Sequence, residues 1–274
     1  EGAWAMGYSE PGAGSDLASL NTRAVKEGDH YRINGSKMWT SDATLCDYIF
    51  VLVRTSPEKP KHEGISLMLV DMRQPGVTVS PIQLISGASP FCETHFSDAV
   101  VPLEDVIGGI DRGWTVGKRL LQFERSTHAG INISGSQGGR SEKSQMPALV
   151  ARYVSSQAGQ LSDPALRRWL TEFEMNSHAQ RITQRRAIEE LSSRAPGFTS
   201  SAVKLTNALN IQDGDELLVA AMGSQGLRWD PETADADELA ALQKWLYQKS
   251  LTIAGGTKEV QLNIIAKRVL GLPD

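Results

Sequence analysis

Residues 48–54 read YIFVLVR, and residues 65–72 read ISLMLVDM. Both runs are short and rich in β-branched, aromatic and other apolar side chains, which is the composition of buried strands. Two similar runs follow at 77–85 and 93–101, and turns containing Pro, Gly, Asp and Ser separate them. Short strands at this regular spacing are typical of an antiparallel β-barrel or sandwich.

A hairpin is expected ahead of these strands, within residues 31–39. Asn34-Gly35 lies in this segment. Asn-Gly is the dipeptide that most strongly favours a two-residue hairpin turn, because both positions tolerate positive φ. The β pattern ends near residue 107.

Helical signals dominate from about residue 111 onward. Asp163-Pro164 is a helix start with proline in the first turn, and apolar residues then recur at near-helical spacing. A last helix is expected over residues 258–270, where a glycine ends it. The sequence therefore predicts an α+β fold with two domains, a β domain (1–110) and an antiparallel helical bundle (111–274).

The composition excludes several classes of protein. The chain has 274 residues, of which 40% are apolar and 22% charged, and its net charge is -4. These values are ordinary for a globular protein and give no electrostatic case for binding nucleic acid or an anionic membrane. The longest apolar runs have six residues, whereas a membrane span needs about 20. Cys46 and Cys92 cannot form a disulfide framework, and the five histidines show no metal-ligand spacing.

Three glycine-containing motifs are candidates for ligand binding. They are SEPGAGSD (9–16), NGSKMWTS (34–41) and AGGT (254–257). Glycine lets backbone amides approach a ligand closely, and neighbouring hydroxyl groups can bond an anion or a polar heterocycle. Gly12-x-Gly14 lacks the third glycine of a dinucleotide fingerprint, so a Rossmann fold is not predicted.

Five motifs in order and spacing resemble the middle and C-terminal parts of the acyl-CoA dehydrogenase family. They are SEPGAGSD, NGSKMWTS, HFSDAVVP (95–102), LLQFERSTHAG (120–130) and TIAGGTKEVQLNIIAKRVLGLP (252–273). The resemblance covers nearly the whole chain. It implies FAD as cofactor, an acyl-CoA thioester as substrate and an electron-transfer flavoprotein or a similar protein as electron acceptor.

The resemblance also implies roles for individual residues. Those assigned to FAD are Tyr8, Ser9, Trp39, Thr40, Ser41, Thr257 and Glu259. In the family, the residues matching Trp39, Thr40 and Ser41 line the flavin ring, and those matching Thr257 and Glu259 hold the adenine end. Ser15 and Arg125 are assigned to the substrate. A tryptophan of the hydrophobic core is the alternative interpretation of Trp39.

The catalytic base has two positions in this family. Most members carry a glutamate directly before the Gly-Thr that opens the final helix, and this sequence has Gly255 there. A minority place the glutamate on an earlier helix, directly before an arginine, and Glu124-Arg125 matches that place. We therefore expect Glu124 to take the α-proton, while the Gly255 backbone N–H polarises the thioester carbonyl. The alternative for Glu124 is a solvated helix residue paired with a neighbouring arginine.

Several alternatives stay open. The family's Arg-x-x-Phe-Gly motif is absent after Arg152, which suits a non-catalytic subunit of a heteromeric enzyme, and a flavin oxidase or monooxygenase of the same fold is also consistent. A homodimer, tetramer or heteromer is expected, in the bacterial cytoplasm or the mitochondrial matrix. The family's N-terminal helical domain is not among these residues, so we expect Glu1 to be a truncation point. Ser201-x-x-Lys204 matches part of a β-lactamase motif, and we expect it on a helix surface instead.

Overall fold

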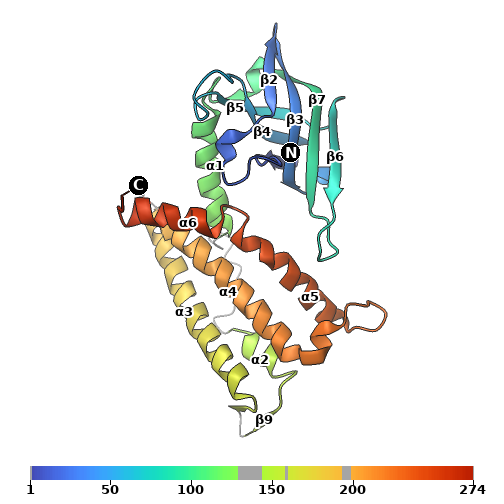
Figure 1. The fold of residues 1–274 in the computed structure, drawn as a ribbon, viewed down its shortest axis with the longest axis vertical. Helices are drawn as coiled ribbons and strands as arrows, with labels where there is room; N and C mark the ends of the chain where they lie inside the picture. The colour runs from blue at the N-terminus through green and yellow to red at the C-terminus, as the bar shows by residue number, and fades with distance from the viewer. Residues whose placement is uncertain (1, 129–143, 158–159, 193–198, 274) are drawn as a thin grey trace. The chain divides into compact units, whose positions relative to one another are not determined.

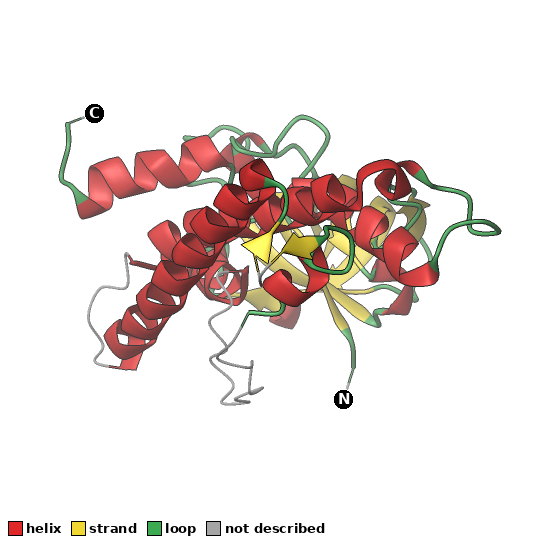
Figure 2. Ribbon diagram, turned by 90° about the horizontal axis from the view of Figure 1, so that it is seen from below, coloured by secondary structure: helices red, strands yellow, loops and turns green. Residues whose placement is uncertain are grey.

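The computed structural model describes residues 2–128, 144–157, 160–192 and 199–273 (Figure 1). The chain divides into two compact units, Glu1–Gln122 and Phe123–Asp274. The long strands belong to the first unit and the long helices of the bundle to the second (Figure 2). The predicted α+β segregation is therefore confirmed. The units divide within a helix at Gln122, whereas the sequence placed the domain boundary at residue 110.

Eight strands of the first unit form one sheet. They are β1 (Trp4–Gly7), β2 (Arg23–Glu27), β3 (His30–Ser41), β4 (Tyr48–Arg54), β5 (Ile65–Asp71), β6 (Val77–Ile82), β7 (Phe91–Pro102) and β8 (Val106–Ile107). Their order is β6-β7-β3-β2-β4-β5-β8, with β1 paired to β4. β6 and β8 do not pair with each other in this order, so the sheet is open and the expected closed barrel is wrong. No second sheet of the described first unit packs on it to make a sandwich.

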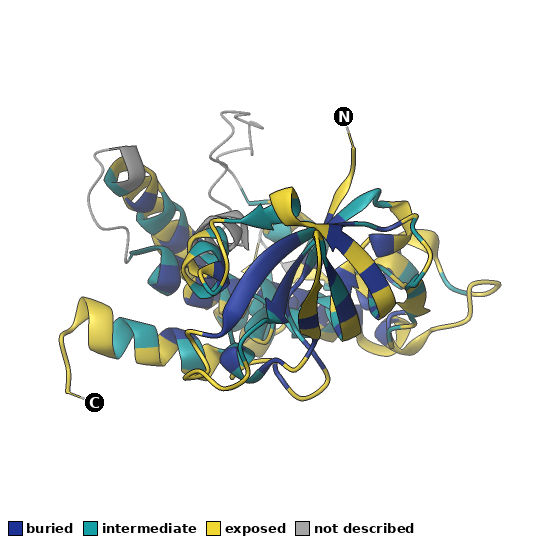
Figure 3. Ribbon diagram, turned by 90° about the horizontal axis from the view of Figure 1, so that it is seen from above, coloured by how far each residue is buried: buried dark blue, intermediate teal, exposed yellow. Residues whose placement is uncertain are grey.

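The central strand β4 is buried on both faces of the sheet. Ile49, Val51 and Val53 face one apolar cluster, which the inner residues of β3, β5 and β7 complete. Leu52 faces a second cluster on the opposite side. Side chains pointing alternately to the two faces produce this division, and Figure 3 shows buried and exposed residues alternating along the strands. The continuous apolar run 48–53 therefore belongs to a strand covered on both sides.

Helix α1 (Gly113–His128) covers the second cluster. Its first turns contribute Trp114, Val116, Leu120 and Leu121. At Gly113 a Cβ atom would lie 2.2 Å from the Ser66 carbonyl carbon, so only glycine lets the helix begin this close to β5. This packing explains why the compact unit extends beyond residue 110.

The hairpin expected at Asn34-Gly35 is wrong, because β3 runs through both residues. Gly35 has φ 142°, and a Cβ there would lie 2.7 Å from the Thr22 Cα. The dipeptide therefore permits a close approach between two segments. The Asn34 side chain is bonded to Asp98 of β7, donating through Nδ2 to Oδ1 at 3.0 Å. The turn between β2 and β3 lies instead at residues 28–29, where Gly28 has φ 63°.

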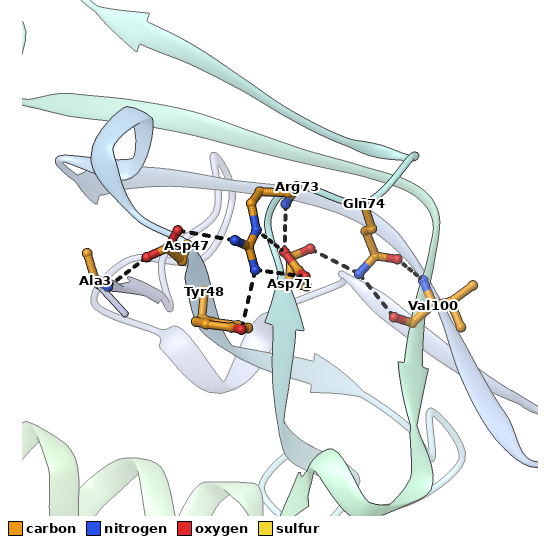
Figure 4. A network of polar contacts seen from close by, with 7 residues as sticks. All are labelled: Ala3, Asp47, Tyr48, Asp71, Arg73, Gln74 and Val100. Carbon is orange, nitrogen blue, oxygen red and sulfur yellow. Dashed lines mark hydrogen bonds and ion pairs between the residues drawn. The ribbon is translucent and has the colours of Figure 1, made fainter. Parts of the chain in front are cut away.

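A network of hydrogen bonds and ion pairs lies at one end of the sheet (Figure 4). The Arg73 guanidinium donates to Asp71 Oδ1 at 3.2 Å and to the Tyr48 hydroxyl at 3.3 Å, and its Nη1 lies 3.6 Å from Asp47 Oδ1. Gln74 donates to the Val100 carbonyl and accepts from its N–H. These bonds tie the turn after β5 to β4 and β7.

The second unit is built from helices. They are α2 (Met146–Val150), α3 (Pro164–Ser192), α4 (Thr199–Met222), α5 (Ala236–Gln248) and α6 (Lys258–Ile264), the last continuing into a π turn, Ile265–Val269. A small pair of strands, β9 (Ser156–Gln157) and β10 (Gln160–Leu161), precedes α3. Asp163 caps α3 as predicted, since its Oδ1 accepts from the N–H groups of Ala165 and Leu166 at 2.8 and 3.0 Å.

Helices α3 and α4 pack antiparallel. Trp169 near the start of α3 donates to Asp213 near the end of α4 at 2.8 Å, whereas Gln180 further along α3 donates to the Val203 carbonyl near the start of α4 at 3.1 Å. None of the helices within the described ranges is both long and apolar enough to cross a membrane.

Candidate functional site

The end of β3 contains a bulge that turns Trp39 outward. Lys37 pairs with Thr94 and Thr40 with Cys92, so two residues of β3 lie opposite one of β7. Lys37 and Thr40 are consequently both fully buried although they are three residues apart. Trp39 has φ 64° and remains 50% exposed, with its ring edge-on to Phe91 at a centroid distance of 6.0 Å. The bulge thus presents an indole at the surface from a well-packed strand.

The three residues assigned to the flavin ring differ in their surroundings. Ser41 is exposed next to the exposed Trp39. The Thr40 hydroxyl accepts from the Thr94 hydroxyl at 3.3 Å inside the sheet. Trp39 and Ser41 therefore offer side chains to a ligand, whereas Thr40 could offer only its backbone.

A buried ion pair joins the 8–16 loop, which precedes β2, to β3. Lys37 Nζ lies 2.7 Å from Glu10 Oε1 and donates to the Tyr8 carbonyl at 3.1 Å. The same carboxylate accepts from the N–H groups of Asn21 at 2.7 Å and Thr22 at 3.0 Å. Both ends of the ion pair therefore have several hydrogen bonds, which is the condition under which a buried pair is tolerated.

Burial and attraction oppose each other in this pair. Burial lowers the pKa of Lys37 to about 8, and the attraction of Glu10 only partly offsets it. Burial alone would raise the pKa of Glu10, but the Lys37 charge and the donors from Asn21 and Thr22 outweigh it and hold that pKa below its ordinary value. Lys37 and Glu10 are therefore both charged at neutral pH and fix the loop against β3.

The other residues predicted in the 8–16 loop have separate positions. The Tyr8 ring is buried in the second apolar cluster, with its hydroxyl 3.5 Å from the Gly117 carbonyl of α1. Ser9 accepts the Met38 N–H through its carbonyl at 2.9 Å, and Ser15 is exposed. Ser9 and Ser15 can meet a ligand, while Tyr8 lies behind them in the core.

In the second unit, the segment 251–257 connects α5 to α6. Thr257 caps α6, its hydroxyl accepting from the Val260 N–H at 3.3 Å, and Glu259 is exposed in the first turn. Gly255 has φ 64° and Gly256 has φ 95°, conformations that favour glycine. Within the residues that the structure describes, the N–H groups of Gly255 and Gly256 have no hydrogen-bond acceptor. The segment therefore carries backbone donors that are available to a ligand.

The predicted base and its neighbour lie on α1. The backbone of Glu124 and Arg125 is helical, and their side chains lie outside the described residues. Their proposed roles accordingly stay predictions.

Buried polar residues that the sequence did not indicate lie beside the 8–16 loop and beside the 251–257 segment. Ser201 and Lys204 were expected on a helix surface, but only 3% and 2% of their area is exposed. Lys204 donates to carbonyls of the 251–257 segment. Lys37 had one usable signal, since it is the only ionisable side chain of NGSKMWTS, whereas SEPGAGSD contains both Glu10 and Asp16. No signal in the sequence alone identified Lys204.

In the described residues, no three His, Cys, Asp or Glu side chains are grouped to hold a metal ion.

Comparisons with known proteins match the chain over almost its full length. The family model for the acyl-CoA dehydrogenase middle domain matches residues 5–99, and that for the C-terminal domain matches residues 111–270. Acyl-CoA dehydrogenase IpdE1 of Mycobacterium tuberculosis is 38% identical over 271 residues, which cover 98% of this chain and 67% of that protein.

Two solved structures have the same fold. The Tcur3481-Tcur3483 steroid ACAD is 33% identical with a TM-score of 0.82, over 98% of this chain and 68% of that one. The ChsE4-ChsE5 complex from Mycobacterium tuberculosis is 27% identical with a TM-score of 0.78, over 99% and 69%. These similarities place the chain among the flavoprotein oxidoreductases of lipid metabolism. Within that class, the chain belongs to the acyl-CoA dehydrogenase family.

Proposed function

We propose that the protein of which this chain forms part catalyses FAD-dependent α,β-dehydrogenation of an acyl-CoA thioester. Glu124 removes the α-proton, and the Gly255 N–H donates to the thioester carbonyl. The observation that carries the proposal is the Gly255 segment, whose amides have no acceptor among the described residues although its carbonyls are bonded. A donor of this kind stabilises negative charge developing on a carbonyl oxygen.

The residues at the end of β3 fit a flavin. A half-exposed indole is held outward by a bulge, next to an exposed hydroxyl, and the 8–16 loop is fixed to the same strand by the Glu10–Lys37 pair. This set suits a planar heterocycle with polar edges. Trp39 and Ser41 would hold the ring, and Thr257 and Glu259 the adenine end. When bound, FAD would supply the acceptor for the β-hydrogen, which leaves as hydride.

The chain's own part of the reaction is proton transfer and carbonyl polarisation. The Glu124 carboxylate accepts the α-proton, which becomes more acidic as negative charge moves onto the thioester oxygen. Hydrogen bonding from Gly255 to that oxygen lowers the cost of this charge. Proton removal therefore acts on the α-carbon, and polarisation acts on the carbonyl group bonded to it.

The test is the visible spectrum of the purified full-length protein, followed by anaerobic addition of acyl-CoA. We expect flavin absorbance that is bleached by an acyl-CoA, and no oxygen consumption beyond that of a dehydrogenase control. A panel from butyryl-CoA to steroid-derived acyl-CoA would define the substrate class. A flavin-containing protein that no acyl-CoA reduces would refute the proposal, and rapid oxygen consumption would favour an oxidase or monooxygenase.

A second candidate is a subunit that completes the site of a different chain. Gly255 stands where the resemblance implies a carboxylate in most members, and the two similar structures named above are of two-component proteins by name. If the purified protein is colourless and takes up FAD only after co-expression with a second acyl-CoA dehydrogenase polypeptide, this candidate is favoured. Flavin binding and turnover by the single polypeptide would exclude it.

Replacing Trp39 with alanine should lower the affinity for FAD by about 3- to 10-fold, since one aromatic contact is lost. The effect on folding should be small, because half of the Trp39 surface is exposed. Trp229 is a matched control, being 44% exposed in the second unit and outside the proposed site. Fluorescence titration of the apoprotein with FAD measures the difference. Equal FAD affinities for the Trp39→Ala and Trp229→Ala variants would contradict the role of Trp39.

A further inference from the structure

Lys204 of α4 is a buried lysine that the proposed reaction does not use directly. Only 2% of its surface is exposed. Its Nζ donates to the Leu251 carbonyl at 3.1 Å and to the Gly256 carbonyl at 2.7 Å. Taking an ammonium group out of water is costly unless its hydrogen bonds are replaced. Here the replacements are carbonyls at the two ends of the segment that contains Gly255.

Gln261 of α6 bonds to the same segment from a second helix. Its side chain is fully buried, and its Nε2 donates to the Gly255 carbonyl at 2.9 Å. Gly256 has φ 95°, a conformation that favours glycine, and a Cβ there would lie 2.7 Å from this Nε2 and displace it. Three carbonyls of the segment, those of Leu251, Gly255 and Gly256, are therefore bonded to buried side chains.

Bonding these carbonyls fixes the direction of the amides. In a trans peptide the C=O and N–H groups point in opposite directions. Bonding the Gly255 carbonyl to Gln261 and the Gly256 carbonyl to Lys204 therefore directs the N–H groups of Gly256 and Thr257 away from those side chains. The Gly255 N–H belongs to the preceding peptide, and Gly255, with φ 64°, lies between the two carbonyls to which Lys204 donates. Its own N–H, the proposed carbonyl donor, has no acceptor among the described residues.

We propose that Lys204 is a positioning residue that holds the 251–256 segment so that the Gly255 N–H points at the substrate carbonyl. The inference rests on the proposed function. Lys204 thus acts on the thioester only through the position of this segment, without touching the substrate.

The experiment uses the full-length protein with FAD and a bound enoyl-CoA product. The readout is the stretching frequency of the thioester carbonyl, measured by Raman or infrared difference spectroscopy, because polarisation of this bond lowers the frequency. We expect Lys204→Met to lose most of the wild-type shift and to lower kcat by about 10- to 100-fold, with a change in KM of less than about threefold. This loss in kcat is somewhat smaller than the loss that follows deletion of an oxyanion donor itself. Lys204→Arg should retain most of the shift.

Lys244→Met is the control for a purely structural effect. Lys244 of α5 lies 2.9 Å from the buried Asp215 carboxylate, so its loss destabilises the bundle without altering the 251–256 segment. It should keep the wild-type carbonyl shift. If Lys204→Met does not fold, Gln261→Met replaces it as the test variant, because it removes the bond to the Gly255 carbonyl without removing a charge.

The outcomes separate the two hypotheses. If acyl-CoA reduces the wild-type flavin but the folded Lys204→Met variant (or Gln261→Met in its place) keeps the full carbonyl shift, the inference is wrong and the proposed function stands. If bound enoyl-CoA shows no carbonyl shift in the wild type and acyl-CoA does not reduce its flavin, the proposed function is wrong. The inference about Lys204 is then wrong as well.

Discussion

Replacing Glu124 with glutamine should leave FAD bound and slow its reduction by acyl-CoA by about 10²- to 10⁴-fold, the usual contribution of a general base. Glutamine keeps the size of the side chain and removes its ability to accept a proton. No second acidic residue is present in the sequence of α1, and Gly255 supplies no carboxylate. Anaerobic stopped-flow absorbance measures the reduction rate.

A matched variant separates proton transfer from general loss of charge. Glu172 of α3 is exposed and pairs with Arg168 at 2.9 Å, so Glu172→Gln removes one carboxylate from the same unit and should reduce flavin at the wild-type rate. Exchange of the substrate α-proton with solvent gives a second readout. Rapid exchange or undiminished flavin bleaching in Glu124→Gln would show that the base lies elsewhere.

The elements that the sequence predicted well are those with local signals. The strand expected at residues 48–54 has those bounds in the structure, because six consecutive apolar residues, 48–53, lie between polar turns. Helix α3 begins at Pro164 as expected, since Asp163 supplies the cap within the same few residues. Local chemistry is sufficient for such elements.

The sequence predictions that are wrong concern features whose structure depends on residues distant in the chain. The Asn34-Gly35 dipeptide has the composition of a hairpin turn, but Thr22 and Asp98 determine that it lies within a strand. Whether a sheet closes depends on the order of its strands, and in this chain β3 lies between β2 and β7. Periodicity along one segment carries no information on that order.

The candidate site shows the same division. Its glycines, Trp39 and Thr257 were recognisable from motifs, whereas its supporting residues were not. Lys204 lies in a helical pattern in which a lysine is usually solvated. It is buried because carbonyls some 50 residues later in the chain replace its water. Residues that position a site are therefore harder to find from one sequence than residues that touch a ligand.

Breaking the buried ion pair of the first unit should have the largest effect on stability. Lys37→Met leaves the Glu10 carboxylate buried with only backbone donors, and Glu10→Gln leaves the Lys37 ammonium without its counter-ion. Removing one partner of such a pair costs about 3–5 kcal/mol. The variant with both replacements should recover part of that loss, because neither charge is then left alone. Urea unfolding with hydrogen exchange at the β3 amides measures the loss in the first unit.

The dependence on pH identifies the pair as the cause. The folded pKa of Glu10 lies below its ordinary value of 4.5. Its stabilisation is thus complete above that value and is lost as pH falls through the folded pKa. The stability difference between the wild type and Glu10→Gln should therefore shrink in acid.

The folded pKa of Lys37 is also lowered, from 10.5 to about 8, so the folded chain releases this proton at a lower pH than the unfolded chain does. Relative to Lys37→Met, the wild type should gain stability as pH rises from about 8 to 10.5, by about 1 kcal/mol per pH unit at most. Parallel pH profiles for the wild type and both single variants would show that the pair does not control the stability of this unit.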